Sequence, residues 1–284
     1  MVSLASTHMP SIDSIRILNM TQEEQTALLT LLDQERQTII YPGVTRISEE
    51  GILKDISTDG KSCQIVYTHA SESDIDRIIT DQIEAVRTLG YELEWKIYGH
   101  DEPHSLGERL QAAGFQPDDV EQFMVFHANS ESVKRFGPVT HDIRKITTRE
   151  GLADFQKILE EINGKSCAGE MEQYAFMLEH HPDNLSFYIA YVNNEPATCA
   201  RIYFHKDSKF AGLYGGNTLK RFRNRGLYTQ IAAARIQEAI SRGVPYVTID
   251  AAPTSEPILK KRGFEIVTYT QPYGLCNKSP QSVS

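Results

Sequence analysis

Several features that would place the sequence in a common class of protein are absent. Its four cysteines form no CxxC pair, so no zinc motif or short disulfide framework is indicated, and reduced buried thiols are expected. No apolar run approaches the ~18 residues of a membrane span. The N-terminus has no basic region followed by an apolar stretch, so no signal peptide is expected. These absences predict a soluble, cytoplasmic protein.

Positive charge is also scarce. The chain of 284 residues has a formal net charge of −9, which argues against nucleic acid or an anionic membrane as a general partner. The charge is uneven: residues 1–137 hold 11 Lys+Arg against 23 Asp+Glu, whereas residues 138–284 hold 18 against 15. An acidic half joined to a mildly basic half indicates separate roles, and the acidic half could attract a cationic acceptor.

Both halves show alternating strand-like and helix-like segments, which is typical of α/β or α+β domains. A polar segment at 127–142, with Gly137-Pro138 inside it, is the best candidate linker. The halves share a weak repeat of helix end, strand, short helix, Gly-Phe and strand. The repeat aligns residues 110–115 with residues 259–264.

Local patterns define individual elements. Thr21 followed by Glu24 is a capping-box signature for a helix. Residues 71–90 carry apolar side chains at helical spacing and end at Gly90. The segments 185–192 and 197–205 flank the turn "NNEP", which predicts a hairpin. A strand over 210–219 then leads directly into an unusual loop.

That loop packs four cations into six residues, Lys220, Arg221, Arg223 and Arg225, before a single Gly226 and a helix. The N–H groups of a helix's first turn are unpaired, and with the helix dipole they favour an anion such as a pyrophosphate. A solvated turn is the alternative, because the loop is neither a Walker motif nor GxGxxG.

The helix after Gly226 has an apolar face that predicts its packing. Ala232, Ala233, Ile236 and Ile240 fall on this face. Arg235, Glu238 and Arg242 are expected on the opposite, solvated face. Leu227 and Ile231 lie off the apolar face, so the first turn is expected to pack against a different element.

From Asp142 to Leu275 the order of elements resembles the GNAT superfamily of acyl-CoA-dependent N-acyltransferases. The family's phosphate loop reads Arg/Gln-x-x-Gly-x-Gly/Ala, and the matching positions hold Arg223, Gly226 and Tyr228. The segment "SEPILKKRGF" looks like the family's late helix ending in Gly-Phe. The repeat extends the resemblance weakly to residues 14–127.

The resemblance implies two tandem GNAT-like domains, each a mixed, mostly antiparallel sheet flanked by helices. Residues 1–130 would form a degenerate domain, because its matching segment, "THASESDIDR", is acidic and lacks glycine. Residues 131–284 would form the domain that binds acetyl-CoA as a co-substrate. The acceptor would be an amine of a small molecule or peptide, and the oligomeric state stays open.

The same resemblance assigns the cofactor-binding residues. Thr218 and Leu219 would pair their main chain with the pantetheine arm, and Ser255 would cap the late helix or touch the cofactor. Arg223 would add charge. The loop N–H groups would bind the pyrophosphate and belong to Asn224, Arg225, Gly226, Leu227, Tyr228 and Thr229.

Two positions depart from the family pattern. Tyr228 stands where a second small residue is usual, so the loop would be tighter or the ring would lie over the ligand. Leu259 stands where many members place a tyrosine acid, so the proton for the departing thiolate would come from elsewhere or from water.

Acetyl transfer needs an unprotonated amine. For a lysine-like amine, losing the proton at pH 7 costs roughly 4–5 kcal/mol, so a general base is useful. The strand over 210–219 contains no carboxylate. The catalytic candidates are Asp250, Tyr214 and Tyr273, although Asp250 could be only a turn former and the tyrosines only pocket walls. His205, Tyr246 and Tyr269 are weaker alternatives.

No metal site is expected. The motif "HDEPH" places His100 and His104 near two acids, but Pro103 breaks the helical face that a zinc motif would use. The sequence therefore predicts an N-acetyltransferase that works by direct attack in a ternary complex. The alternatives are a non-catalytic acyl-CoA sensor and an adaptor whose acidic half binds a protein.

Overall fold

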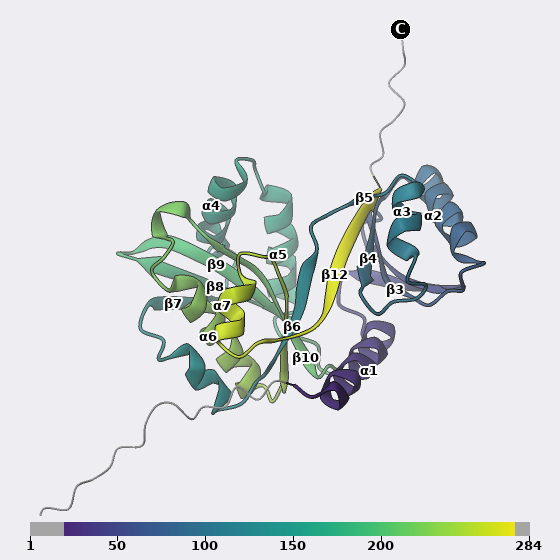
Figure 1. Cartoon of the computed structure of the whole chain (residues 1–284). Helices are drawn as coiled ribbons and strands as arrows, with labels where there is room; N and C mark the ends of the chain where they lie inside the picture. Colours follow the sequence, from purple (N-terminus) through teal and green to yellow (C-terminus); the bar gives the residue numbers. More distant parts are fainter. Residues whose placement is uncertain (1–19, 276–284) are drawn as a thin grey trace, which may run out of the picture.

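The computed structural model of the chain describes residues 20–275 (Figure 1). Of the four cysteines, Cys276 lies outside this range, and the other three are buried free thiols. No helix in the described range is both long and apolar enough to cross a membrane. The helical segments are α1 Gln22–Thr38, α2 Ile75–Leu89, α3 Leu106–Ala112, η2 Ser132–Phe136, α4 Leu152–Asn163, α5 Ala168–His180, η3 Lys220–Phe222, α6 Leu227–Ser241 and α7 Glu256–Lys261.

All strands within residues 20–275 join one sheet, in the order β1-β2-β3-β4-β12-β6-β11-β10-β9-β8-β7, with β5 paired to β12. The strands of the first half are β1 Val44–Glu49, β2 Ile52–Ser57, β3 Ser62–Thr68, β4 Glu92–Tyr98, β5 Gln116–Pro117 and β6 Glu121–His127. Those of the second half are β7 Asp142–Ile146, β8 Leu185–Val192, β9 Glu195–Tyr203, β10 Phe210–Thr218, β11 Tyr246–Ala251 and β12 Glu265–Leu275.

The two halves repeat one topology. In each, a series of antiparallel strands ends in a parallel pair joined through a helix: β3 and β4 through α2, and β10 and β11 through α6. A short helix, α3 or α7, follows each parallel pair. The predicted tandem fold, a mostly antiparallel sheet flanked by helices in each half, is therefore confirmed.

The halves exchange their last strands. The strand β6 follows the elements of the first half, yet it pairs along its length with β11 of the second half. The C-terminal strand β12 pairs first with β6 and then with β4, and Thr270 is the partner of both Glu121 and Tyr98. Figure 1 shows β12 as the long yellow strand between the two groups of elements.

The hydrophobic cores reflect this exchange. Met124 and Phe126, from the first half of the sequence, are buried in the core built by the second half. Tyr273, from the end of the chain, is buried in the core of the first half with Trp95 and Phe115. Each core is therefore completed by a strand that arrives from the other half.

Local sequence signals explain where several elements begin and end. The capping box of α1 is confirmed, because the Glu24 N–H donates to the Thr21 hydroxyl at 3.2 Å and the Thr21 N–H donates to the Glu24 carboxylate at 2.7 Å. The turn between β8 and β9 places Asn193 and Asn194 at φ 52° and 63°, which asparagine tolerates in a tight hairpin. The predicted hairpin is therefore confirmed.

The prediction for α6 is wrong at Arg235, which is only 1% exposed. Its guanidinium donates to the carbonyl oxygens of Ile231 at 3.1 Å, Arg201 at 2.9 Å and Tyr214 at 3.4 Å. Burial lowers the pKa of Arg235 to about 10. Leu227 and Ile231, which lie off the predicted apolar face, are buried as well, in agreement with the expected packing of the first turn.

Candidate functional site

The site begins where two parallel strands part. The pairing of β10 with β11 runs from Phe210 opposite Tyr246 to Gly212 opposite Thr248, and then stops. A β-bulge between Tyr214 and Asn217 redirects β10 beyond that point. The bulge depends on glycine, because Gly215 has φ +58° and a Cβ there would lie 2.8 Å from the Arg201 guanidinium.

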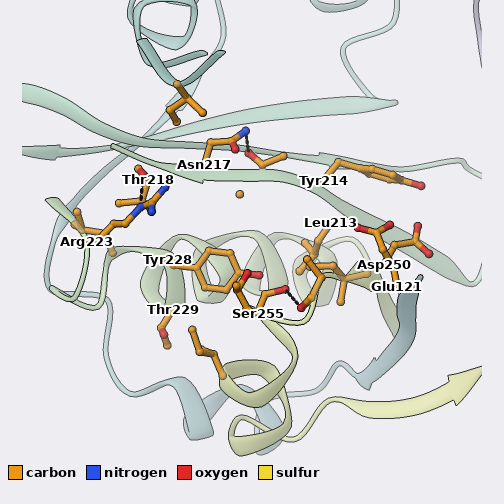
Figure 2. A pocket seen from close by; sticks show the side chains of 18 of the residues that line it. Glu121, Leu213, Tyr214, Asn217, Thr218, Arg223, Tyr228, Thr229, Asp250 and Ser255 are labelled. Atoms are coloured by element: carbon orange, nitrogen blue, oxygen red, sulfur yellow. Dashed lines mark hydrogen bonds between the residues drawn. The ribbon is translucent and has the colours of Figure 1, made fainter. Parts of the chain in front are cut away.

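A cavity of about 1110 Å³ fills this opening (Figure 2). Its walls come from β10, the cationic loop with the start of α6, the end of β11 with the start of α7, and strands of the first half of the chain. The lining residues from the first half are Gln64, Glu94, Lys96 and Glu121.

One end of the cavity is the loop before α6. Asn224 and Gly226 adopt φ +62° and +77°, so consecutive N–H groups turn toward the same side. No backbone N–H of residues 224–229 donates a hydrogen bond to another described residue. Six free donors at the N-terminus of a fifteen-residue helix are an anion-binding arrangement.

The four cations of the loop differ in what they face. Arg223 and Arg225 line the cavity, and the Arg223 Nε also donates to the carbonyl oxygen of Thr218 at 3.2 Å. Arg221 instead forms ion pairs with Glu161 and Glu195. Positive charge from Arg223 and Arg225 is therefore available at the loop, whereas that of Arg221 is already neutralised.

Most of the predicted cofactor-binding residues gather here. Thr218, Tyr228, Thr229 and Ser255 all line the cavity, as do the loop residues 223–227. The Tyr228 ring lies against Gly216 of the bulge, where a Cβ would be 2.7 Å from the ring. Burial raises the pKa of Tyr228, and a hydrogen bond with Ser255 partly offsets that rise. The departure at Tyr228 therefore places a ring between β10 and α7.

Leu219 does not fit its expected role. Its side chain is buried in the core. Its N–H donates to the carbonyl of Ala197 at 3.0 Å, and its own carbonyl accepts from the Phe222 N–H at 2.8 Å. The main chain of Leu219 is therefore already hydrogen bonded within the protein, which disfavours the predicted pairing with the pantetheine arm.

The other end of the cavity is acidic. The Asp250 carboxylate accepts a bond from the Lys96 Nζ at 2.6 Å and from the Thr270 hydroxyl at 2.7 Å. Burial alone would lower the pKa of Lys96, but the neighbouring Tyr98 and Asp250 raise it above its ordinary value. Lys96 therefore stays charged and holds Asp250 in place.

Tyr214 also reaches the acidic end. In Figure 2 its ring extends from β10 toward Asp250 and Glu121, on the far side of the cavity from Arg223. Tyr214 is 43% exposed and lines the cavity. Desolvation raises the pKa of Tyr214, so its phenol stays protonated.

Glu121 is the residue that the sequence interpretation missed. It lines the cavity from the start of β6. Burial raises the pKa of Glu121, and the charge of Asp250 raises it further. Alternation within "EQFMVFHA" predicts that Glu121 and Phe123 share a strand face, but no local pattern indicates which strand β6 joins.

Two other positions do not line the cavity. Tyr273 is 3% exposed in the core of the first half, and its hydroxyl donates to the Gln271 side chain at 2.9 Å. The strand exchange therefore carries Tyr273 into the core of the first half and not into the cavity lining, a position that does not favour its predicted catalytic role. Leu259 is 1% exposed in the core of the second half, so that position offers no proton donor.

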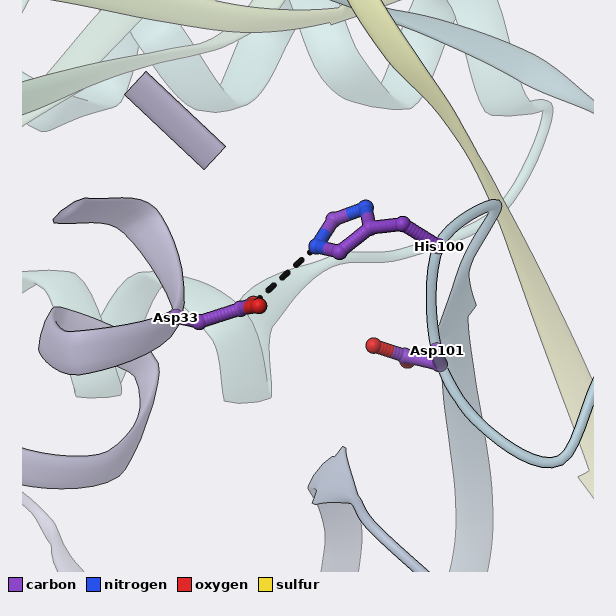
Figure 3. A group of neighbouring side chains, drawn as sticks. All are labelled: Asp33, His100 and Asp101. Carbon is purple, nitrogen blue, oxygen red and sulfur yellow. Dashed lines mark hydrogen bonds and ion pairs between the residues drawn. The ribbon is translucent and has the colours of Figure 1, made fainter. Parts of the chain in front are cut away.

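One group of possible metal ligands occurs within residues 20–275: Asp33, His100 and Asp101 (Figure 3). His100 is hydrogen bonded to Asp33 at 3.0 Å. The Arg36 guanidinium, however, donates to Asp33 at 2.9 Å and to both oxygens of Asp101 at 2.6 and 2.8 Å. The carboxylates are thus neutralised by an internal cation, which indicates an ion-pair network joining α1 to the β4–α3 loop.

Comparison with known proteins places this geometry in context. The model of the acetyltransferase (GNAT) family matches residues 152–264. None of the curated proteins compared with the chain matches it.

Three solved structures share the fold over most of the chain. A functionally unknown conserved protein from Staphylococcus epidermidis has a TM-score of 0.61 and 17% identity, covering 83% of this chain and 95% of its own. A GCN5-related N-acetyltransferase from Kribbella flavida has a TM-score of 0.60 and 13% identity, covering 90% and 96%. A tandem GNAT protein from the clavulanic acid biosynthesis pathway has a TM-score of 0.58 and 12% identity, covering 91% and 96%.

Proposed function

Residues 152–264 form a domain of the acetyltransferase (GNAT) family, and from this premise we propose that the protein transfers an acetyl group from acetyl-CoA to an amine. The observation that carries the proposal is the difference in charge between the two ends of the cavity. Free N–H groups and two arginines occupy one end, and carboxylates occupy the other. A cofactor with phosphates fits the first end, and a cationic amine fits the second.

The cofactor-binding residues follow from the geometry. The pyrophosphate of CoA would accept bonds from the N–H groups of residues 224–229, with Arg223 and Arg225 adding charge. Beyond Gly212, β10 no longer pairs with β11. Its free edge can pair with the amide groups of the pantetheine arm as a peptide strand would. This path leads from the loop toward Tyr214 and Asp250.

The acceptor would enter at the acidic end. Glu121 and Asp250 lie at that end with one cation, Lys96, and Glu94 lines the same cavity. A protonated amine is attracted to such a site. Two of these carboxylates, together with Lys96, come from the first half of the chain. That half would therefore form a wall of the acceptor site while binding no cofactor itself.

Tyr214 is the candidate for contact with the departing sulfur. Its phenol stays protonated because burial raises its pKa, so it can donate a hydrogen bond as negative charge develops on the sulfur. Leu259, at the position where the family often has a tyrosine, is buried.

Binding of CoA directly tests the proposed pyrophosphate site of residues 223–229, hereafter the cradle. Replacing both Arg223 and Arg225 by methionine should raise the Kd for CoA by at least tenfold in isothermal titration, because two charge-assisted contacts to phosphate are lost. The control is Arg221→Met, which removes one charge from the same loop. Because Arg221 is paired with Glu161 and Glu195, the Kd of R221M for CoA should differ from that of wild type by less than twofold. An equal rise in the Kd for CoA in the double variant and in R221M would contradict the cradle.

Turnover tests the reaction. Wild-type protein with acetyl-CoA and a panel of primary amines should release free CoA thiol, which a thiol reagent detects, together with an equal amount of acetylated amine. Tight CoA binding without turnover of any amine would instead favour the non-catalytic sensor.

A further inference from the structure

We propose that Glu121, a residue of the first half of the chain, accepts the proton of the acceptor amine. The inference rests on the proposed function and adds the identity of its general base. It also gives the exchange of strands between the halves a catalytic consequence, because β6 carries Glu121 into the cavity of the second half.

The strand register places Glu121 beside the other polar groups of the cavity. On β6, Phe123 is the partner of Asp250 on β11, and Glu121 lies two residues from Phe123 on the same face. On the other side of β6, Glu121 is the partner of Thr270 on β12. Thr270, which bonds Asp250, therefore shares that face as well.

The same face continues into the first half of the sheet. Thr270 is the partner of Tyr98 on β4, and Lys96 lies two residues from Tyr98. Lys96 reaches Asp250 along this face. A row of polar groups thus crosses the boundary between the halves, with Glu121 within it. Figure 2 shows the Glu121 and Asp250 side chains at the same end of the cavity, below the Tyr214 ring.

Glu121 differs from the other cavity carboxylates in being unengaged. Asp250 is bonded to Lys96 and Thr270 through both of its oxygens, and Glu94 accepts a bond from the Gln64 amide. The Glu121 side chain has no hydrogen bond or ion pair with any residue from 20 to 275. Its oxygens are free to accept a proton from a ligand.

The surroundings of Glu121 favour uptake of a proton by its carboxylate. Burial is the largest cause that raises the pKa of Glu121, and the charges of Asp250 on β11 and of Asp118 and Asp119 before β6 raise it further, whereas Lys96 on β4 opposes them. A raised pKa makes the Glu121 carboxylate a better proton acceptor than an exposed glutamate.

The step balances for a primary amine. The acceptor enters as an ammonium ion and gives one proton to the Glu121 carboxylate. The freed lone pair forms a bond to the thioester carbonyl carbon, and the carbon–sulfur bond breaks with its electron pair on sulfur. A second nitrogen proton ends on that sulfur as the CoA thiol. The amide keeps the third proton, and Glu121 releases its own to water.

The test compares E121Q with wild type at pH 7.5, using propylamine as a strongly basic probe and 2,2,2-trifluoroethylamine as one that is largely unprotonated. E121Q should lower kcat/KM by about 10²-fold for propylamine and by much less for trifluoroethylamine. Its activity with propylamine should recover as the pH rises toward the pKa of the amine. The Kd for CoA should stay unchanged.

E94Q is the matched control, because it removes one carboxylate from the same cavity. It should raise KM for propylamine while keeping the wild-type pH profile. If wild type acetylates neither probe, the proposed function fails and the inference with it. If wild type is active and E121Q shows the wild-type pH profile and the same loss for both probes, only the assignment of the base fails.

A thermal measurement gives an independent readout. Because the folded-state pKa of Glu121 is raised, stability is greatest below the unfolded-state pKa and falls as pH rises through the folded-state value. E121Q imitates the protonated form, so its Tm should exceed that of wild type at pH 7.5, with the difference shrinking toward pH 4.5. A lower Tm for E121Q at pH 7.5 would overturn the inference, because it would show that the carboxylate has a structural partner.

Discussion

At the residue scale, the Lys96–Asp250 pair joins the halves of the chain through one contact inside the cavity. The two side chains are 17% and 12% exposed, and Nζ lies 2.6 Å from the carboxylate. The pair is therefore mostly desolvated. In such a pair, removing one partner costs far more than the pair contributes, because the other charge stays buried without compensation.

Lys96→Met should accordingly lower the free energy of unfolding by about 3 kcal/mol, measured by urea denaturation at pH 7. K96M/D250N should recover most of that loss, since the orphaned charge is gone. The comparison is Arg77→Met, which breaks the exposed pair with Glu50 and should cost less than about 1 kcal/mol. A K96M loss as small as that of R77M would mean that solvent already screens Asp250.

Residue identities in the cradle were predictable because their signal is local. A cationic loop, one glycine and a helix start are contiguous in sequence. Of the cofactor-binding residues predicted from them, all except Leu219 line the cavity. Lys96, Glu94 and Glu121 were not predictable. They lie about a hundred residues from the loop, and only long-range strand pairing brings them to Asp250.

At the element scale, the loop before α6 depends on backbone conformation more than on side-chain bulk. Gly226 has φ +77°, and a Cβ at that position would meet no protein atom within 4 Å. Glycine is therefore needed for the left-handed conformation and for the close approach of a ligand to the N–H groups.

Gly226→Ala should lower the free energy of unfolding by about 1 kcal/mol and raise the Kd for CoA at least several-fold. Gly243, just beyond the end of α6, provides a matched control, because it has φ +73° and equally open space around its Cα. G243A should cost similar stability and leave the Kd for CoA unchanged. An unchanged Kd in G226A would contradict the close approach of phosphate to the loop.

The elements themselves were largely predictable. The capping box, the glycine ends of helices and the asparagine turn are short-range signals that tertiary structure preserves. The burial of α6 was not predictable, because a periodic pattern assigns an arginine such as Arg235 to the polar face of a helix. In the structure its guanidinium satisfies three carbonyl oxygens, two of which belong to β9 and the bulged β10. A buried arginine of this kind depends on partners that a helix pattern does not contain.

At the scale of the whole molecule, the exchange of β6 and β12 makes the two halves interdependent. The repeat predicts two similar units, and either strand is compatible with either unit. Which strand joins which sheet is decided by the packing of Met124 and Phe126 in one core and Tyr273 in the other. That choice leaves no mark in local sequence patterns.

The exchange predicts what a cut between the halves would do. Gly137 and Pro138 are exposed and lie between β6 and β7, so a protease site inserted there should be tolerated. After cleavage the fragments should elute together in gel filtration and bind CoA with unchanged Kd. The reason is that β6 keeps six residue pairs with β11, and β12 keeps six with β4. Each fragment alone should be unfolded by circular dichroism, because its own sheet lacks a central strand. Fragments that separate as folded monomers would show that the halves are independent domains joined by a simple linker.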